Sequence, residues 1–79
     1  MKIKLVSYGI AREILNGKYQ DFEFKGNTIG DLKDALISRY PDFKKLKALS
    51  FAVGERYQVD SWPLNENEEV VVIPPVSGG

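Results

Sequence analysis

The sequence predicts an α+β domain in which a mixed sheet of four to five strands carries one main helix across one face. Several short segments have alternating or continuous apolar residues, which is typical of strands. One longer stretch repeats apolar residues at spacings of three and four, as an amphipathic helix does. Because no second stretch is long enough for a crossover helix, a mixed sheet with the helix on one face is the economical architecture. A chain of 79 residues is expected to form one domain with a small core.

The first predicted elements are a strand at residues 2–8 and a short helix after it. Ile3 and Leu5 alternate with lysines, so both are expected to face the core. The next segment, residues 9–17, is bracketed by glycines and predicts one or two helical turns. The apolar residues expected on one face of this short helix are Ile10, Ile14 and Leu15.

A second strand is predicted at residues 19–27 and the main helix at residues 29–39. In the strand, the residues expected to point inward are Phe22 and Phe24. Thr28 can cap the helix, and Asp31 in the first turn favours its positive end. The apolar face of the helix is predicted to carry Ile29, Leu32, Leu36 and Tyr40. Pro41 disfavours helical geometry at the residue before it, so the helix is expected to end there.

The C-terminal half predicts a hairpin and a last strand. The alternating apolar residues of the first hairpin strand are Leu49, Phe51 and Val53. Residues 54–55 supply a turn, and residues 57–59 are expected to return as a short strand. The continuous apolar run at residues 70–73 favours a strand at the centre of the sheet.

The composition excludes several classes of function. The chain has no cysteine and no histidine, so disulfides, thiolate metal sites and the commonest general base are missing. Its 11 basic and 11 acidic side chains cancel, and no basic stretch is long enough to follow a phosphate backbone. No segment approaches the apolar length of a membrane span. We therefore expect a cytoplasmic protein that is no enzyme on its own and binds no metal, nucleic acid or membrane, and no cofactor directly.

The C-terminal sequence PPVSGG is the candidate functional element. Pro74 and Pro75 cannot pair as central strand residues and favour an extended backbone that leads away from the sheet. Gly78 and Gly79 have no Cβ, so they fit a narrow channel in a partner protein. The terminal carboxylate of Gly79 is ionised at neutral pH, and it reacts further only after a second protein activates it. The residues expected to hold this tail in a partner are Pro74, Pro75, Val76, Ser77 and Gly78.

Four stretches make the chain resemble a known family: AREILNG, TIGDLKDAL, AVGERYQVD and PLNENEEVVVIPPVSGG. With them it resembles the small subunits of molybdopterin synthase, which are ubiquitin-like β-grasp sulfur carriers, over nearly its whole length. The Pro-Pro before Val-Ser-Gly-Gly is the specific part, since terminal Gly-Gly is shared with other ubiquitin-like carriers. The resemblance implies a β-grasp domain at residues 1–75 and an extended C-terminal Gly-Gly tail at residues 76–79.

The resemblance also implies a mechanism. Gly79 would be adenylated by an ATP-dependent, ubiquitin-activating-like enzyme and then converted to a thiocarboxylate. The tail would insert into the large synthase subunit, in a heterotetramer, and donate its sulfur to cyclic pyranopterin monophosphate. Arg12, in the Arg-Glu pair after the first strand, would join the partner-binding residues. Trp62 departs from the family pattern, which has a small or polar residue in that loop.

Alternative functions are compatible with the same terminus. They are a thiamine-pathway sulfur carrier, a ubiquitin-like protein modifier and a ubiquitin-like module that binds without covalent chemistry. The Pro-Pro-Val-Ser lead-in argues against the thiamine pathway, and the binding module would not need Gly79 to be the last residue. For all carriers, an apolar docking patch is expected near the point where the tail leaves the sheet. The residues predicted for this patch are Val6, Tyr8, Ile73 and Val76.

Overall fold

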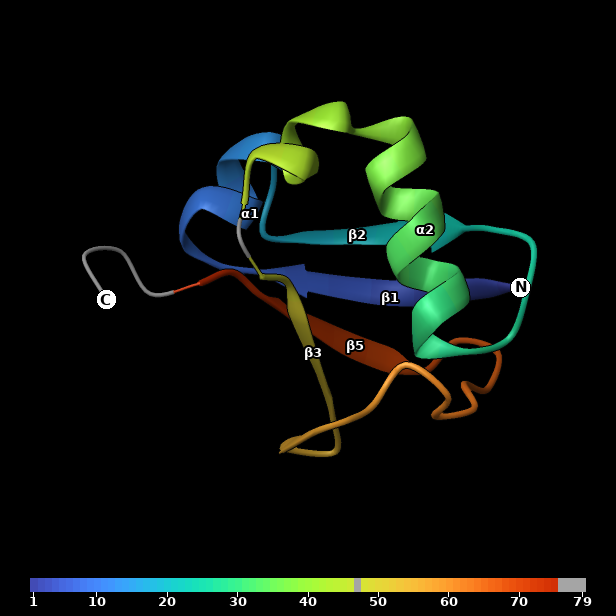
Figure 1. The fold of residues 1–79 in the computed structure, drawn as a ribbon. Helices are drawn as coiled ribbons and strands as arrows, with labels where there is room; N and C mark the ends of the chain where they lie inside the picture. The colour runs from blue at the N-terminus through green and yellow to red at the C-terminus, as the bar shows by residue number, and fades with distance from the viewer. Residues whose placement is uncertain (47, 76–79) are drawn as a thin grey trace.

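A computed structural model describes residues 1–46 and 48–75 and contains a five-stranded mixed sheet with helices over one face (Figure 1). The α+β architecture predicted from the sequence is confirmed. The strands are β1 (Lys2–Ser7), β2 (Tyr19–Glu23), β3 (Ser50–Val53), β4 (Arg56–Tyr57) and β5 (Glu69–Ile73). The helices are α1 (Gly9–Leu15), α2 (Ile29–Arg39) and a short 3-10 helix, η1 (Pro41–Lys45).

β5 lies at the centre of the sheet, as its continuous apolar sequence predicts. The strand order is β2-β1-β5-β3-β4, with β5 parallel to β1 and antiparallel to β3. Val70 and Val72 are fully buried under the helices, whereas Val71 and Ile73 point to the other side of the sheet and are half-buried. The last strand therefore has one face in the core and one face that is only partly covered.

The main helix, α2, begins and ends where its sequence signals lie. The Thr28 side chain accepts a hydrogen bond from the Asp31 backbone N–H (3.1 Å), and the Asp31 carboxylate accepts one from the Thr28 N–H (3.2 Å), which completes a capping box. Hydrogen bonds from Asn27 and Thr28 hold the pKa of the Asp31 carboxyl below its usual value. This contribution to stability is therefore present above the ordinary pKa and lost as the pH falls through the lowered one. The fully buried residues of the helix are Ile29, Leu32 and Leu36.

Replacing the capping hydroxyl should weaken the fold measurably. We expect Thr28→Ala to lower the free energy of unfolding by about 1 kcal/mol, because the Asp31 N–H loses its acceptor. Thr28→Ser keeps the hydroxyl and should remain close to the wild type. Chemical denaturation of the three proteins followed by circular dichroism measures the effect, and equal midpoints for Thr28→Ala and wild type would contradict the cap.

The segment after α2 adds a core residue that the sequence analysis missed. Pro41 opens η1, and Phe43 on this turn is buried at 2% exposure, with its ring edge-on to Tyr40. The prediction for the short helix α1 is wrong in one residue. Ile10 is 41% exposed, and α1 instead buries Ala11 and Leu15, which are four residues apart on one helical face.

The loop before β5 packs against the start of α2. The backbone N–H groups of Ile29 and Gly30 donate to the carbonyls of Trp62 (3.0 Å) and Asp60 (2.8 Å), so the first helical turn has its acceptors. Gly30 suits this close approach, since a Cβ there would lie 3.2 Å from the Asp60 carbonyl oxygen, a tight contact to which the loop would have to adjust. Lys33 adds an exposed ion pair to Asp60 (3.3 Å). The Trp62 loop is thereby fixed to the helix.

The sheet face opposite α2, called the open face below, carries a row of apolar side chains across all five strands. Strand registers pair neighbours in this row directly, from β2 to β4. Its members are Tyr19, Val6, Val71, Ala52 and Tyr57. Tyr19 and Tyr57 at the two ends are about 70% exposed (69% and 70%), whereas Val6 and Ala52 between larger neighbours are buried.

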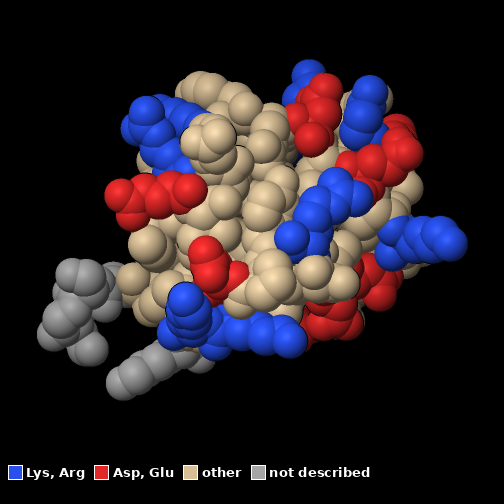
Figure 2. Space-filling view, turned by 90° about the horizontal axis from the view of Figure 1, so that it is seen from above, with Lys and Arg blue, Asp and Glu red and all other residues tan. Residues whose placement is uncertain are grey.

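The helical side of the molecule differs from the apolar row of the open face, because it carries charged side chains of both signs (Figure 2). Seen from above, basic and acidic side chains are interspersed with uncharged surface, and neither sign covers the whole of this face (Figure 2). Within residues 1–46 and 48–75, no helix has both the length and the apolar composition needed to cross a membrane.

Candidate functional site

The candidate site is the end of β5, where the chain leaves the sheet. β5 pairs with β1 as far as Val72 and with β3 as far as Ile73, which lies opposite Ser50. Pro74 and Pro75 follow outside the strand and are half-buried. Because proline has no N–H, the ladder ends here and the backbone is directed past the edge of the sheet. Val76, Ser77, Gly78 and Gly79, which the sequence analysis assigned to the tail, lie outside the described residues.

A glycine turn after β1 sits beside this exit. Since β1 and β5 are parallel, Ser7 lies opposite Val72, and the turn at Tyr8 and Gly9 comes next to Pro74. A Cβ on Gly9 would lie 3.7 Å from the Pro74 Cγ. Gly9 has a φ of 57°, a conformation that other residues adopt only with strain. The exit is therefore bordered by a tight turn that favours glycine.

Helix α1 places Arg12 on the same side of the molecule. The helix ends at Asn16, which has a left-handed backbone (φ 60°), and the Gly17 N–H donates to the Arg12 carbonyl (3.1 Å). The exposed Arg12 side chain lines a shallow, open depression. The depression is formed by Gly9, Ile10, Arg12, Glu13, Asn16 and Gly17. Arg12 is thus close in the chain to the Gly9 turn, on a surface that a tail-binding protein can reach.

The loop after α1 is held to the end of β1. The buried Ser7 hydroxyl donates to the Gly17 carbonyl (3.2 Å), and the Ser7 N–H donates to the Lys18 carbonyl (2.8 Å). Ser7 is fully buried, so its hydroxyl needs this acceptor. The two bonds fix Lys18 and Tyr19 beside the end of β1, at the same end of the sheet as the exit.

Lys18 is a candidate binding residue that the sequence analysis missed. Its ammonium lies 5.0 Å from the centre of the Tyr8 ring and 5.3 Å from the centre of the Tyr19 ring. Both distances are within the range of a cation–π interaction. Two-residue alternation puts Tyr8 and Tyr19 on the open face, so their positions were readable from the sequence, but the turn that brings Lys18 between them was not.

The predicted docking patch needs one correction. Val6 is only 3% exposed because it lies between Tyr19 and Val71 in the cross-strand row, so it is not available to a partner. Tyr8 is 48% exposed and Ile73 half-exposed, and both remain candidates. Val76 lies outside the described residues. The available apolar surface of the open face is therefore Tyr8, Tyr19, Tyr57, Val71 and Ile73.

The described residues contain no arrangement suited to metal binding, since no three histidine, cysteine, aspartate or glutamate side chains gather in residues 1–46 and 48–75. The carboxylate with a clearly shifted pKa, Asp31, is occupied in the helix cap.

Comparison with known sequences agrees with this reading of the chain. The model of the ThiS family matches residues 8–79. A curated relative from Chlamydomonas reinhardtii, named molybdopterin synthase sulfur carrier subunit, is 32% identical, and the alignment covers 100% of both chains. A relative of the same name from Arabidopsis thaliana is 29% identical over 100% of this chain and 84% of its own length.

Solved structures place the fold among ubiquitin-like proteins. The small archaeal modifier protein 1 of Methanosarcina acetivorans has a TM-score of 0.77 at 18% identity, covering 99% of this chain and 96% of its own. The ubiquitin of Caldiarchaeum subterraneum has a TM-score of 0.64 at 24% identity, covering 100% and 98%. A chain of the BexX/CysO complex of Amycolatopsis orientalis has a TM-score of 0.68 at 19% identity, covering 98% and 99%. The predicted β-grasp fold is thereby confirmed.

Proposed function

Because this chain belongs to the ThiS family, we propose that it is the sulfur carrier subunit of a molybdopterin synthase. The observation that carries the proposal is the full-length match to molybdopterin synthase sulfur carrier subunits, together with a central strand, β5, that ends directly before the sequence PPVSGG. The parallel pairing of β1 and β5 supports it, since it sets the glycine turn at Gly9 next to Pro74 at the exit.

The chemistry proposed for the tail takes place at Gly79. In an activating enzyme, a carboxylate oxygen of Gly79 attacks the α-phosphorus of ATP, which forms an acyl-adenylate and releases pyrophosphate. A sulfide equivalent then attacks the acyl carbon, AMP leaves, and the chain ends in a thiocarboxylate. ATP is consumed in the activating enzyme, so the carrier itself needs no bound cofactor and is not a catalyst on its own. Its part is to present an accessible acyl group.

The proposed partners are that ubiquitin-activating-like enzyme and the large subunit of the synthase, which forms a heterotetramer with the carrier. The tail residues, Pro74 to Gly79, would lie in a channel of each partner, with Arg12 at its mouth. The exposed Tyr8 and the half-buried Ile73 flank the exit and supply an apolar surface that a partner can bury. Inside the large subunit, the thiocarboxylate would donate sulfur to cyclic pyranopterin monophosphate.

Intact mass spectrometry tests the proposed function. The full chain is incubated with the activating enzyme of the same organism, ATP and a sulfur donor. We expect the mass to rise by the difference between sulfur and oxygen, and the product to support pterin dithiolene formation with the large subunit. Sulfuration without pterin activity would assign the carrier to another pathway, such as thiazole synthesis. Isopeptide-linked products instead of a thiocarboxylate would identify a protein modifier.

A glycine requirement in the tail provides a further prediction. We expect Gly78→Ala to lower the rate of sulfuration strongly, because a Cβ obstructs a narrow channel and disfavours positive φ values. Ser77→Ala is the matched control, since it shortens a side chain one residue earlier and should have a much smaller effect. The measurement is the initial rate of mass gain for both variants. Equal rates would show that the channel does not select for glycine.

A further inference from the structure

The ammonium of Lys18 is held in place at one end of the open face. It lies over the rings of Tyr8 (5.0 Å) and Tyr19 (5.3 Å), and the backbone carbonyl of Lys18 accepts the N–H of Ser7 (2.8 Å). Lysine is usually a flexible side chain that loses rotamer freedom when a partner binds it. The two rings restrict it beforehand, which reduces this loss on binding.

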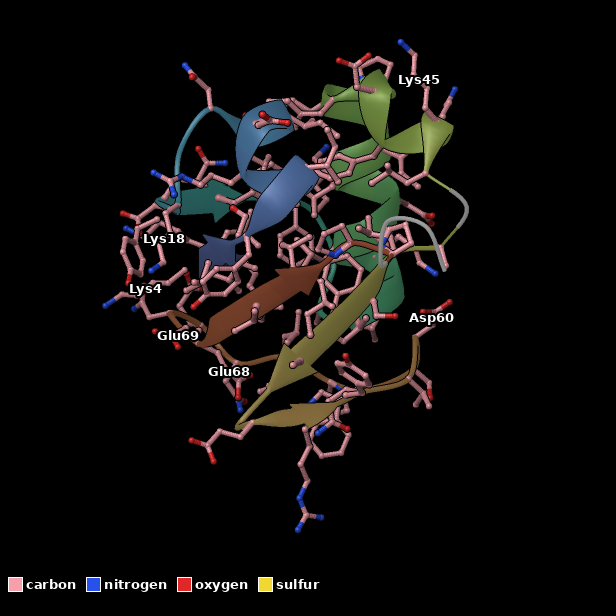
Figure 3. The ribbon with its side chains drawn as sticks, turned by 90° about the vertical axis from the view of Figure 1, so that its left-hand side faces the viewer. Lys4, Lys18, Lys45, Asp60, Glu68 and Glu69 are labelled. Atoms are coloured by element: carbon pink, nitrogen blue, oxygen red, sulfur yellow. The ribbon has the colours of Figure 1, made fainter. Side chains whose placement is uncertain are left out.

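The surroundings of Lys18 differ from those of Lys2 and Lys4, which also lie on this face. In the strand registers, Lys4 lies between Asp21 of β2 and Glu69 of β5, although neither carboxylate is within 4.0 Å of its ammonium. Lys18 precedes β2 and has no carboxylate residue opposite it in a strand register. Among the described residues, no carboxylate lies within 4.0 Å of the Lys18 ammonium. Figure 3 shows Lys18, Lys4 and Glu69 on the same side of the molecule and Lys45 on the other. Lys18 is thus a localised positive charge beside apolar surface, at the end of the sheet from which the tail leaves.

We propose that Lys18 is a charged anchor for the enzyme that activates the tail, and that this enzyme presents a carboxylate opposite it. The inference rests on the proposed function, because it takes the tail to be inserted into that enzyme. Lys18 is connected to the exit through the turn after β1. Its ammonium contacts the ring of Tyr8, and the next residue, Gly9, borders Pro74. A protein that encloses the tail and extends over the Tyr8–Gly9 turn reaches Lys18, and a carboxylate there matches both its charge and its N–H donors.

The activating enzyme is the partner that this arrangement fits best. It must bind, modify and release the carrier in every cycle. Charges at the rim of an interface chiefly raise the rate of encounter and select the partner, whereas buried apolar contacts slow release. Lys18 is half-buried beside exposed rings, as a rim residue is. It should therefore act on KM and on the salt dependence of the reaction and leave the chemical step alone.

The test compares two substitutions that change the charge equally. Sulfuration kinetics of the full chain are measured with Lys18→Glu and with Lys45→Glu. Lys45 lies on the other side of the molecule (Figure 3), and its ammonium pairs with Asp42 on η1 (3.4 Å). We expect Lys18→Glu to raise KM about 25-fold, through loss of one ion pair and a new repulsion, and Lys18→Gln about fivefold. The value of kcat should not change. Lys45→Glu should keep KM within about twofold of the wild type.

Salt and ring variants separate an anchor from a general charge effect. The wild-type KM should rise with ionic strength, and the rise should be shallower for Lys18→Gln. Tyr19→Phe keeps the ring and should behave as the wild type, whereas Tyr19→Leu should raise KM two- to threefold, a rough estimate for one exposed cation–π contact. Equal KM values for Lys18→Glu and Lys45→Glu, or a fall in kcat alone, would overturn the anchor. The proposed function would still stand in that case, provided that the wild type is sulfurated normally. If the wild type is never sulfurated, the proposed function fails and the anchor with it.

Discussion

Leu36→Ala is expected to lower the free energy of unfolding by about 2–5 kcal/mol. Leu36 is fully buried on α2, and it belongs to the single core cluster formed with Ile3, Leu5, Phe22 and Val72. The substitution removes apolar surface from that cluster and leaves a cavity that neighbours on the rigid sheet fill only in part. Small domains have total stabilities near the lower end of about 5–15 kcal/mol, so this change removes a large share.

The denaturant midpoint measured by circular dichroism reports this effect. Ser38→Ala is the matched control, because Ser38 is exposed on the same helix and a surface change of this kind stays within about 0.5 kcal/mol. An unchanged midpoint for Leu36→Ala would show that α2 does not present this residue to the sheet. Because alanine has a higher helix propensity than serine, a similar loss for Ser38→Ala would point to a general disturbance of α2 and not to the loss of core packing at Leu36.

The sequence predicted the main helix almost completely, because its signals are local. Thr28 and Asp31 stand three residues apart and make their two hydrogen bonds within one turn. Pro41 ends the pattern through a steric effect on its immediate neighbour. Strand β5 was equally readable, since an uninterrupted apolar run suits a central position whatever lies beside it.

The errors arose where burial depends on distant parts of the chain. Ile10 fits an apolar helical face, yet it is exposed because α1 turns Ala11 and Leu15 toward the core. Val6 alternates with inward-facing residues, yet its neighbours in the sheet, Tyr19 and Val71, cover it. The burial of Val6 is set by strand order and register, and the exposure of Ile10 by the way α1 packs on the core. Local periodicity contains neither kind of information.

The candidate site also has one part that the sequence predicted and one part that it did not. The Gly-Gly terminus and its two prolines are contiguous residues, so composition alone pointed to them. The exit environment is assembled from the end of β1, the loop after α1 and the end of β5. Lys18 meets Tyr8 only because Ser7 fixes the intervening loop with two hydrogen bonds. Such a contact between residues ten apart follows from the fold and has no signature in the sequence.

The largest functional effect is expected at Gly79. Deleting this residue, or adding one residue after it, should abolish sulfuration and pterin-dependent activity, because the activated acyl carbon must be the last one of a chain of fixed length. A shorter or longer tail places the carboxylate about 3.5 Å from the reacting position, the span of one residue. The fold should survive, since the core cluster ends at Val72 and the free energy of unfolding depends on residues before the tail. Intact mass after incubation with activating enzyme, ATP and sulfur donor measures the first effect, and the denaturant midpoint the second. A variant that loses sulfuration with an unchanged midpoint confirms a carrier whose chemistry is confined to its end. Equal sulfuration of the wild-type and extended chains, or pterin-dependent activity without Gly79, would instead leave a ubiquitin-like domain that acts by binding alone.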